Sequence, residues 1–384
     1  MFVAVVMGLT CSGCAEETER KYPFPTVPRS ILERLGEMQL GEPPAIDPAE
    51  WKSLEDAWTR RDSLDAEKQT PEYDQLVVKL MLAASGVVTE EAQAPYLRKL
   101  ETLIAGARVA ADKGKPETHP GDSLMKFLHG GVMHGGYEFG QSSFASVFDT
   151  GIYNCVSSTA MYYVIGRELD LEMQIISIPG GSFLSGHACL NLVDGDRTYE
   201  LEPTNPDGFD WGTKLSQPGV FTVGFQPNRK DGHIVDGIGL AATIYSNRGV
   251  DASKAESPDR IAAASLGLRA LMCDPYDSSS AQNVLAVFTN WGPVLAAEGH
   301  YDEAIRALAF GYEVTQDGGV KNNLSITVSE QIASLMKDKK DREVKTAIKH
   351  ASTLLPDDND FKNAEPWIRH ASKSYDDDGG DAAL

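Results

Sequence analysis

The spacing of hydrophobic and polar positions changes twice along this chain. From about residue 47 to residue 111, apolar residues recur every three or four positions, as at Leu97, Leu100 and Ile104, which is typical of amphipathic helices. Between residues 172 and 203 the pattern is that of short strands, and beyond residue 236 it is helical again. The pattern predicts an α+β protein in which a small antiparallel sheet lies between two helical regions.

Helix-start signals support the first helical region, which we place at residues 47–118. Asp47 and Thr70 each precede a proline, so each can cap a helix whose first turn holds that proline. Thr89 can cap a third helix that ends near Ala111, and we expect the first helix to end near Ala66. No residue pattern in this subdomain indicates chemistry.

The segment from Gly151 to Gly208 holds the candidate chemistry. Asn154 can cap a helix that begins at Cys155 and continues for about four turns. The first turn of a helix presents free N–H groups and the positive end of the helix dipole, and both favour the reactive thiolate form of a cysteine. The same N–H groups can form part of an oxyanion hole.

Three strands follow this helix, and two of them form a hairpin at Asp194-Gly195. Antiparallel pairing places His187, near the start of one strand, roughly across from Glu202, near the end of the next. Glu202 could then accept a hydrogen bond from the imidazole and fix its tautomer. Glu200 lies on the same face and is the competing candidate. Cys189 shares the face of His187, and we interpret it as a packing residue.

The segments YNCVSSTAMYYVIGRELDL, Gly186-His187 and LEPTNPDGF resemble the core of the transglutaminase-like superfamily, which has a papain-like cysteine fold. The resemblance covers residues 120–210, and the core is expected over residues 119–236. It implies that Cys155 is the nucleophile, His187 the general base and acid, and Glu202 the orienting carboxylate of a Cys-His-Glu triad. The family usually has Asp at the third position. Gln141 and Tyr137 are the candidates for the oxyanion-stabilising side chain.

Residues 237–372 are alanine-rich and helical. The unit from Trp291 to Leu308 resembles a tetratricopeptide repeat, in which Gly299 and Ala304 are the small residues that let two helices pack closely. Expected ends of helix pairs recur about every 40 residues, at Pro275, Asp317 and Pro356. Repeats of this type present concave surfaces for peptide segments, so a protein partner is possible here. An ordinary helical bundle is the alternative.

Residues 2–9 are apolar but too short to span a bilayer. Ser12, Gly13 and Cys14 follow, and the layout resembles a bacterial lipoprotein signal over residues 1–14, in which Cys14 would carry the lipid. This resemblance implies export to the cell envelope, on the periplasmic side, with membrane contact only through the lipid anchor. Residues 15–46 are expected to form a tether and a first helix. A buried N-terminal strand or helix is the alternative.

Composition narrows the functions further. The net charge of -21 argues against binding to nucleic acid or to anionic lipid, and part of it lies in an acidic tail at residues 373–384. Five cysteines over 384 residues do not make a disulfide framework. His129 and His134 do not share a helical face, so we expect a turn near the site rather than a metal.

Together these features predict an exported cysteine enzyme that acts on peptide or protein amide bonds without a metal or cofactor. Hydrolysis is favoured over acyl transfer, because water is always present and nothing in the sequence visibly excludes it. The alternative is a non-catalytic scaffold that binds a protein partner through its helical repeats.

Overall fold

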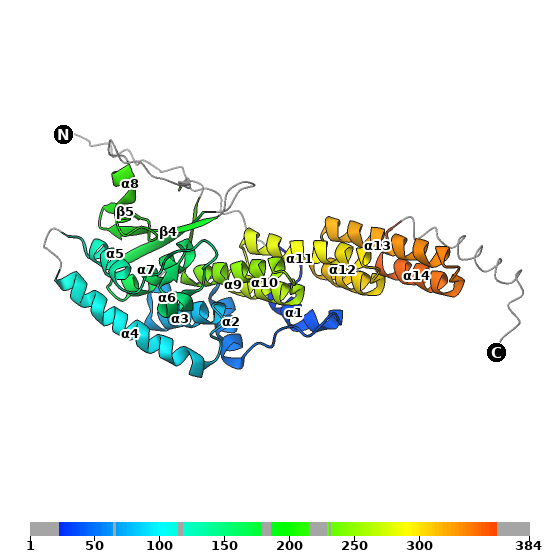
Figure 1. Cartoon of the computed structure of the whole chain (residues 1–384), viewed down its shortest axis with the longest axis horizontal. Coiled ribbons are helices and arrows are strands. Elements are labelled where there is room, and N and C mark those ends of the chain that lie inside the picture. Colours follow the sequence, from blue (N-terminus) through cyan, green and yellow to red (C-terminus); the bar gives the residue numbers. More distant parts are fainter. Residues whose placement is uncertain are drawn as a thin grey trace, which may run out of the picture.

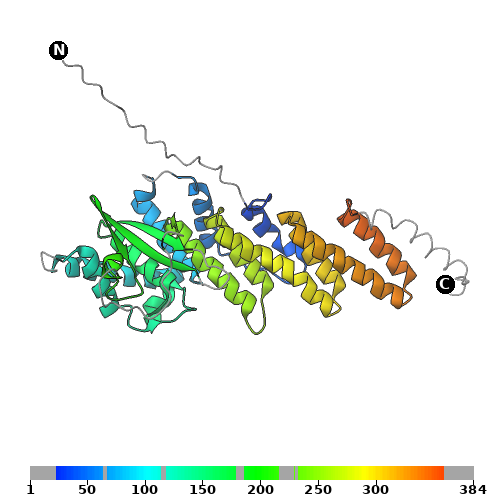
Figure 2. The same cartoon turned by 90° about the horizontal axis from the view of Figure 1, so that it is seen from above.

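The structure is a computed structural model that describes residues 23–63, 67–113, 118–178, 186–215, 229 and 232–358. The expected signal segment with Cys14 and the expected acidic tail lie outside these residues. The molecule is elongated, with an α+β body at one end and an arm of helices at the other (Figures 1 and 2).

The N-terminal helices begin where their capping residues predict. The side chains of Asp47, Thr70 and Thr89 accept hydrogen bonds from backbone N–H groups in the first turns of their helices. The first of these helices ends at Arg60, earlier than the sequence suggested. The elements are α1 (Pro28–Arg34), η1 (Leu35–Met38), α2 (Pro48–Arg60), η2 (Glu67–Gln69), α3 (Pro71–Ala84) and α4 (Glu90–Asp112).

The body is built around α7 (Cys155–Arg167), whose residues from Cys155 to Gly166 are all buried. It packs against a four-stranded antiparallel sheet of order β5-β4-β3-β6 on one side and against neighbouring helices on the other. The remaining elements are α5 (Pro120–Gly130), β1 (Gly136–Tyr137), α6 (Phe144–Thr150), β2 (Ile152–Tyr153), β3 (Glu172–Ile178), β4 (His187–Asp194), β5 (Arg197–Leu201), α8 (Trp211–Leu215) and β6 (His233–Val235). The sequence predicted β3, β4 and β5 but not β6, which has only three residues.

The arm consists of helix pairs that begin about 40 residues apart, as the sequence predicted. Within the described residues these are α9 (Gly237–Lys254) with α10 (Arg260–Cys273), α11 (Ser278–Ala297) with α12 (Tyr301–Thr315), and α13 (Gly318–Lys337) with α14 (Asp341–Leu354).

Gly299 does not have the packing role expected of it. It lies in the turn between α11 and α12 at a φ of +85°, and a Cβ there would meet nothing within 4 Å. Glycine is needed because the backbone is left-handed. Close helix approach is made instead at Gly292, which lies against the side chain of Leu308. Ala304 is fully buried between the helices, as expected.

The body and the arm share their packing. Helix α9 contacts α3 and α7, and its residues Ile238, Leu240 and Tyr245 belong to the hydrophobic core of the body. In the opposite direction, Ile31 and Leu35 of the N-terminal region are buried with the helices of the arm. The change of sequence pattern at residue 237 is therefore not a boundary in packing.

A buried ion pair links the same two parts. Arg269 of α10 donates to both carboxylate oxygens of Glu50 in α2, at 2.8 and 3.0 Å, and the Tyr245 hydroxyl donates to Glu50 at 2.8 Å. Both charged side chains are almost completely buried, so removing either one would leave the other as a buried charge without a partner.

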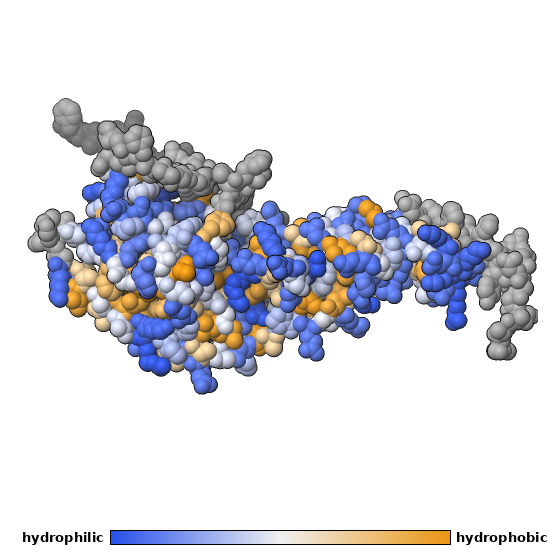
Figure 3. All heavy atoms as spheres, in the orientation of Figure 1, coloured by the Kyte–Doolittle hydropathy of each residue, from blue (hydrophilic) through white to orange (hydrophobic). Residues whose placement is uncertain are grey.

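The visible surface is strongly hydrophilic at the α14 end, with more apolar residues over the body (Figure 3). No helix among the described residues is long and apolar enough to cross a bilayer.

Candidate active site

Cys155 is the first residue of α7, and Asn154 caps that helix as the sequence predicted. The Asn154 side-chain oxygen accepts from the N–H groups of Val156 at 2.9 Å and Ser157 at 3.1 Å. The Asn154 amide in turn donates to the carbonyl of Phe139 at 3.0 Å, which holds the preceding loop beside the helix.

The cap changes the expected oxyanion hole. The N–H groups of Val156 and Ser157 are occupied by Asn154, and that of Ser158 donates to the Asn154 carbonyl at 3.0 Å. The N–H of Cys155 has no partner in the part of the chain that the structure describes. The first turn of α7 therefore offers one backbone donor rather than several.

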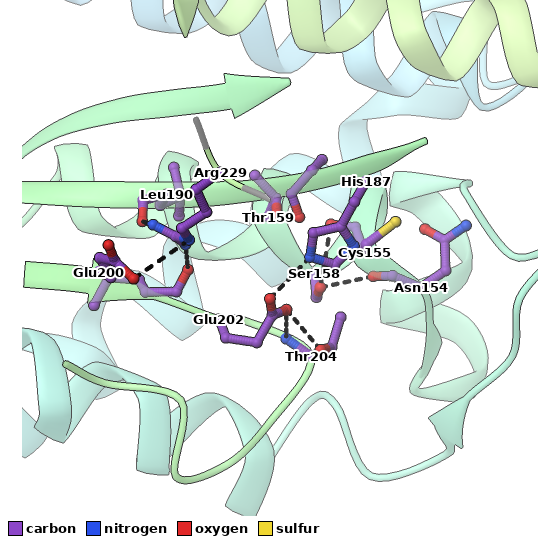
Figure 4. Close-up of polar contacts among 12 residues, drawn as sticks. Asn154, Cys155, Ser158, Thr159, His187, Leu190, Glu200, Glu202, Thr204 and Arg229 are labelled. Carbon is purple, nitrogen blue, oxygen red and sulfur yellow. Dashed lines mark hydrogen bonds and ion pairs between the residues drawn. The ribbon is translucent and has the colours of Figure 1, made fainter. Parts of the chain in front are cut away.

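His187 and Glu202 lie together as the hairpin predicted. Nε2 of His187 is 2.8 Å from Oε2 of Glu202, and the other ring nitrogen is left for Cys155, whose sulfur lies beside the ring in Figure 4. Strand pairing matches Leu190 with Leu201, so Glu202 follows the end of β5 and its side chain reaches back to the ring.

Helix α7 and strand β4 are joined directly behind the pair. Thr159, one turn after Cys155, donates its hydroxyl to the carbonyl of Ala188 at 3.1 Å, and the bond is buried. Ala188 follows His187, so this bond fixes the position of the sulfur along the strand that carries the imidazole.

The environment favours an ion pair at this site. Burial lowers the pKa of His187, but hydrogen bonding to Cys155 and Glu202 and the charges of both groups raise it to about 10. Burial would raise the pKa of Glu202, whereas hydrogen bonds from His187 and from the hydroxyl and N–H of Thr204 hold it below its ordinary value. Glu202 is therefore an anion and His187 a cation near neutral pH.

Glu200, the competing candidate, does not contact His187. Its carboxylate lies 3.7 Å from Nε of Arg229 and is 43% exposed. Arg229 also donates to the carbonyls of Leu190 at 3.2 Å and Leu201 at 2.6 Å, and so joins β4 to β5 (Figure 4). Glu200 is thus the counter-ion of a structural arginine. No local pattern in the sequence indicates this role of Arg229, which lies 28 residues beyond Leu201 in the chain.

The two oxyanion candidates differ in position. Tyr137 is 51% exposed as a whole, but partial burial, followed by the charges of Cys155 and Glu202, raises its pKa to about 12, so its hydroxyl is protonated near neutral pH. The Gln141 side-chain oxygen instead accepts from the Ser143 N–H at 3.3 Å. Tyr137 is the better placed of the two.

The two glycine-flanked histidines have separate roles. His129 Nε2 is 3.0 Å from the carbonyl of Pro203, beside Glu202, and burial lowers its pKa against the opposing effect of that bond. The Tyr153 hydroxyl donates to the carbonyl of Thr204, the residue that follows Pro203, at 3.3 Å. His134 Nδ1 lies 3.0 Å from the carbonyl of Gly131. The described residues contain no group of three His, Cys, Asp or Glu side chains that could hold a metal.

Two of the three catalytic candidates, Cys155 and His187, line a cavity of about 600 Å³, and Glu202 lies behind the imidazole outside its described lining. Cys155 is 7% exposed and His187 is partly buried, and both face this space. Cys189 is completely buried among Ile176 and Ile178, and burial raises its pKa to about 12. It is a packing residue, as we interpreted it from the sequence.

Comparison of the chain with protein-family models, with curated proteins and with solved structures found no match. The transglutaminase-like resemblance is therefore still a prediction from the quoted residues.

Proposed function

We propose that this protein is a cysteine enzyme, with a papain-like arrangement of its core, that cleaves or transfers peptide or protein amides. The observation that carries the proposal is the 2.8 Å bond between His187 and Glu202, on an imidazole whose other side faces a cysteine at the head of a helix. This combination of nucleophile, base and orienting acid is the arrangement that covalent acyl transfer requires.

In this proposal each step is carried by a named group. The Cys155 thiolate attacks the amide carbonyl carbon, and the negative charge that develops on the oxygen is stabilised by the Cys155 N–H and by the Tyr137 hydroxyl. His187 then donates its proton to the leaving amine as the carbon–nitrogen bond breaks, which leaves a thioester. Neutral His187 takes a proton from the incoming water or amine, the carbon–sulfur bond breaks as the acyl group passes to that acceptor, and the thiolate and the protonated ring are restored.

Glu202 orients the ring throughout. It holds the Nε2 proton of His187, so that Nδ1 remains directed at the sulfur. Export and lipidation at Cys14 remain predictions from the sequence.

Competitive alkylation tests the proposal. Iodoacetamide labelling of the native protein, read by peptide mass spectrometry, should modify Cys155 much faster than Cys189 or Cys273, and His187→Ala should remove that advantage. Equal, slow labelling of all three cysteines would refute a catalytic thiol.

A non-catalytic scaffold is the second candidate, and the 7% exposure of Cys155 is the observation that favours it. In that case the helical repeats would carry the function by binding a protein partner. The slow-labelling outcome would decide for this candidate.

A further inference from the structure

The cavity that holds the candidate catalytic pair is closed on one side by the arm. Cys155 and His187 line it from the body, whereas Asn247 of α9 and Asn283 of α11 line it from the arm. The volume of about 600 Å³ lies within the ordinary range of ligand pockets, roughly 300 to 1,000 Å³. In Figure 4 unlabelled helices lie along the upper right edge of the view, to one side of the labelled residues.

The arm side of the cavity carries unused hydrogen-bonding groups. Asn247 is partly buried, and its side chain has no hydrogen-bond partner among the described residues. Asn283 donates from its amide nitrogen to the Ser246 hydroxyl at 3.1 Å, which leaves its carbonyl oxygen available. Primary amides both donate and accept hydrogen bonds, so they match the N–H and C=O groups of an extended peptide backbone.

The same side carries more negative than positive charge. Asp251, Asp274 and Asp277 line it, and Lys254 is the single lysine or arginine among the described lining residues. Asp274 and Asp277 accept backbone hydrogen bonds near the start of α11 and are therefore held in place. Burial, followed by the charge of Asp277, raises the pKa of Asp274, whereas the backbone N–H of Tyr276 and the ring of His233 act in the opposite direction. A cleft of one dominant sign raises the local concentration of oppositely charged ligands.

We propose that α9 and α11 form the substrate-binding wall of the active site, and that the wall binds an extended polypeptide segment with basic side chains in preference to acidic ones. The amides of Asn247 and Asn283 contact the peptide backbone, and Asp251 provides charge selection at the open end of the cavity. This inference rests on the proposed function of Cys155, because the peptide must lie across the sulfur.

Peptide chloromethyl ketones of the form acetyl-Ala-Ala-X-Ala, with X as lysine, alanine or glutamate, test the inference in the full-length chain. The thiolate displaces chloride, so the rate of Cys155 alkylation reports binding without requiring turnover. The lysine probe should react about tenfold faster than the glutamate probe at low salt, the lower end of the effect that charged clefts have on association rates. Asp251→Asn should reduce this ratio, whereas Glu330→Gln, an exposed change on α13 outside the cavity, should not.

Steric block of the wall gives an independent result. Asn247→Trp and Asn283→Trp should slow all three peptide probes at least tenfold more than they slow iodoacetamide, because the larger probes need the wall and the small reagent does not. Asn290→Trp is the matched control, because Asn290 is exposed on α11 and does not line the cavity. If a tryptophan variant is no longer labelled by iodoacetamide at all, its fold is disturbed. The relative rates of the lysine, alanine and glutamate probes in the unaltered protein then test the proposal.

The two proposals fail in different ways. Fast iodoacetamide labelling of Cys155 with equal rates for the lysine and glutamate probes would overturn the substrate wall and leave the cysteine enzyme intact. Slow iodoacetamide labelling would overturn the proposed function itself.

Discussion

Replacing Glu202 by glutamine tests how the candidate triad is held. The substitution keeps the size of the side chain and can keep a hydrogen bond to His187, but it removes the negative charge 2.8 Å from Nε2. A hydrogen bond to a charged group contributes about 1.5–3 kcal/mol, and one pKa unit corresponds to about 1.4 kcal/mol. Glu202→Gln should therefore lower the pKa of His187 by about one to two from its raised value of about 10.

The assay is a ¹H–¹³C NMR titration of the histidine rings, in which His187→Ala identifies the resonance. The imidazolium should be lost at lower pH in Glu202→Gln, so less of it is available to pair with the thiolate near pH 8. At pH 8 the ring is almost fully protonated when its pKa is about 10 and about half protonated when its pKa is about 8, so the iodoacetamide rate of Cys155 at that pH should fall by no more than about twofold.

Glu200→Gln is the matched control, because Glu200 lies on the same face but pairs with Arg229 rather than with His187. It should change the pKa of His187 by less than about 0.3, which corresponds to less than about one kcal/mol of interaction energy. If Glu202→Gln behaves like Glu200→Gln, the carboxylate does not stabilise the imidazolium and the triad is wrong.

Three further changes have calculable effects on stability, each measured by denaturant unfolding followed by circular dichroism. Asn154→Ala should destabilise the protein by about 1–2 kcal/mol, because the N–H groups of α7 lose their cap; an effect near zero would contradict the role of the cap. Arg269→Met should cost about 3–5 kcal/mol because it leaves Glu50 charged and buried, and adding Glu50→Gln should recover most of that loss. The stability difference between the unaltered protein and Glu202→Gln should depend on pH. Glu202 has a lowered pKa, so its contribution is lost as pH falls below about 4.5, and His187 has a raised pKa, so its contribution is lost as pH rises from 6.5 to about 10. A difference that does not change with pH would contradict the ion pair.

Local signals made much of the fold predictable. A capping side chain and its helix start lie within three residues of each other, so Thr70 and Asn154 mark their helices without tertiary information. The hairpin between β4 and β5 is equally local. Asp194 pairs with Arg197 across a two-residue turn in which Gly195 has a φ of +57°. This hairpin could be predicted from the sequence, and it places His187 near Glu200 and Glu202 at one end of the sheet.

Long-range contacts decided what the sequence left open. Period-two alternation places Glu200 and Glu202 on the same face, so it cannot choose between them. The choice follows from Thr204, which holds the Glu202 carboxylate, and from Arg229, which pairs with Glu200. The participation of α11 in the cavity was also hidden, because Asn283 is far from Cys155 in sequence and has no motif around it.

The Asn154 cap on α7 reduces the number of backbone N–H groups that the helix can offer to an oxyanion. A side chain that caps a helix satisfies the same N–H groups that an oxyanion would use, so capping and anion binding compete. Here Asn154 occupies the two donors after Cys155 and leaves the N–H of Cys155 itself. A single backbone donor is a weak oxyanion hole, so a second donor has to come from outside the helix. Tyr137 fits this need because β1 pairs it with Tyr153, two residues before the sulfur, so one short segment fixes both donors relative to the nucleophile.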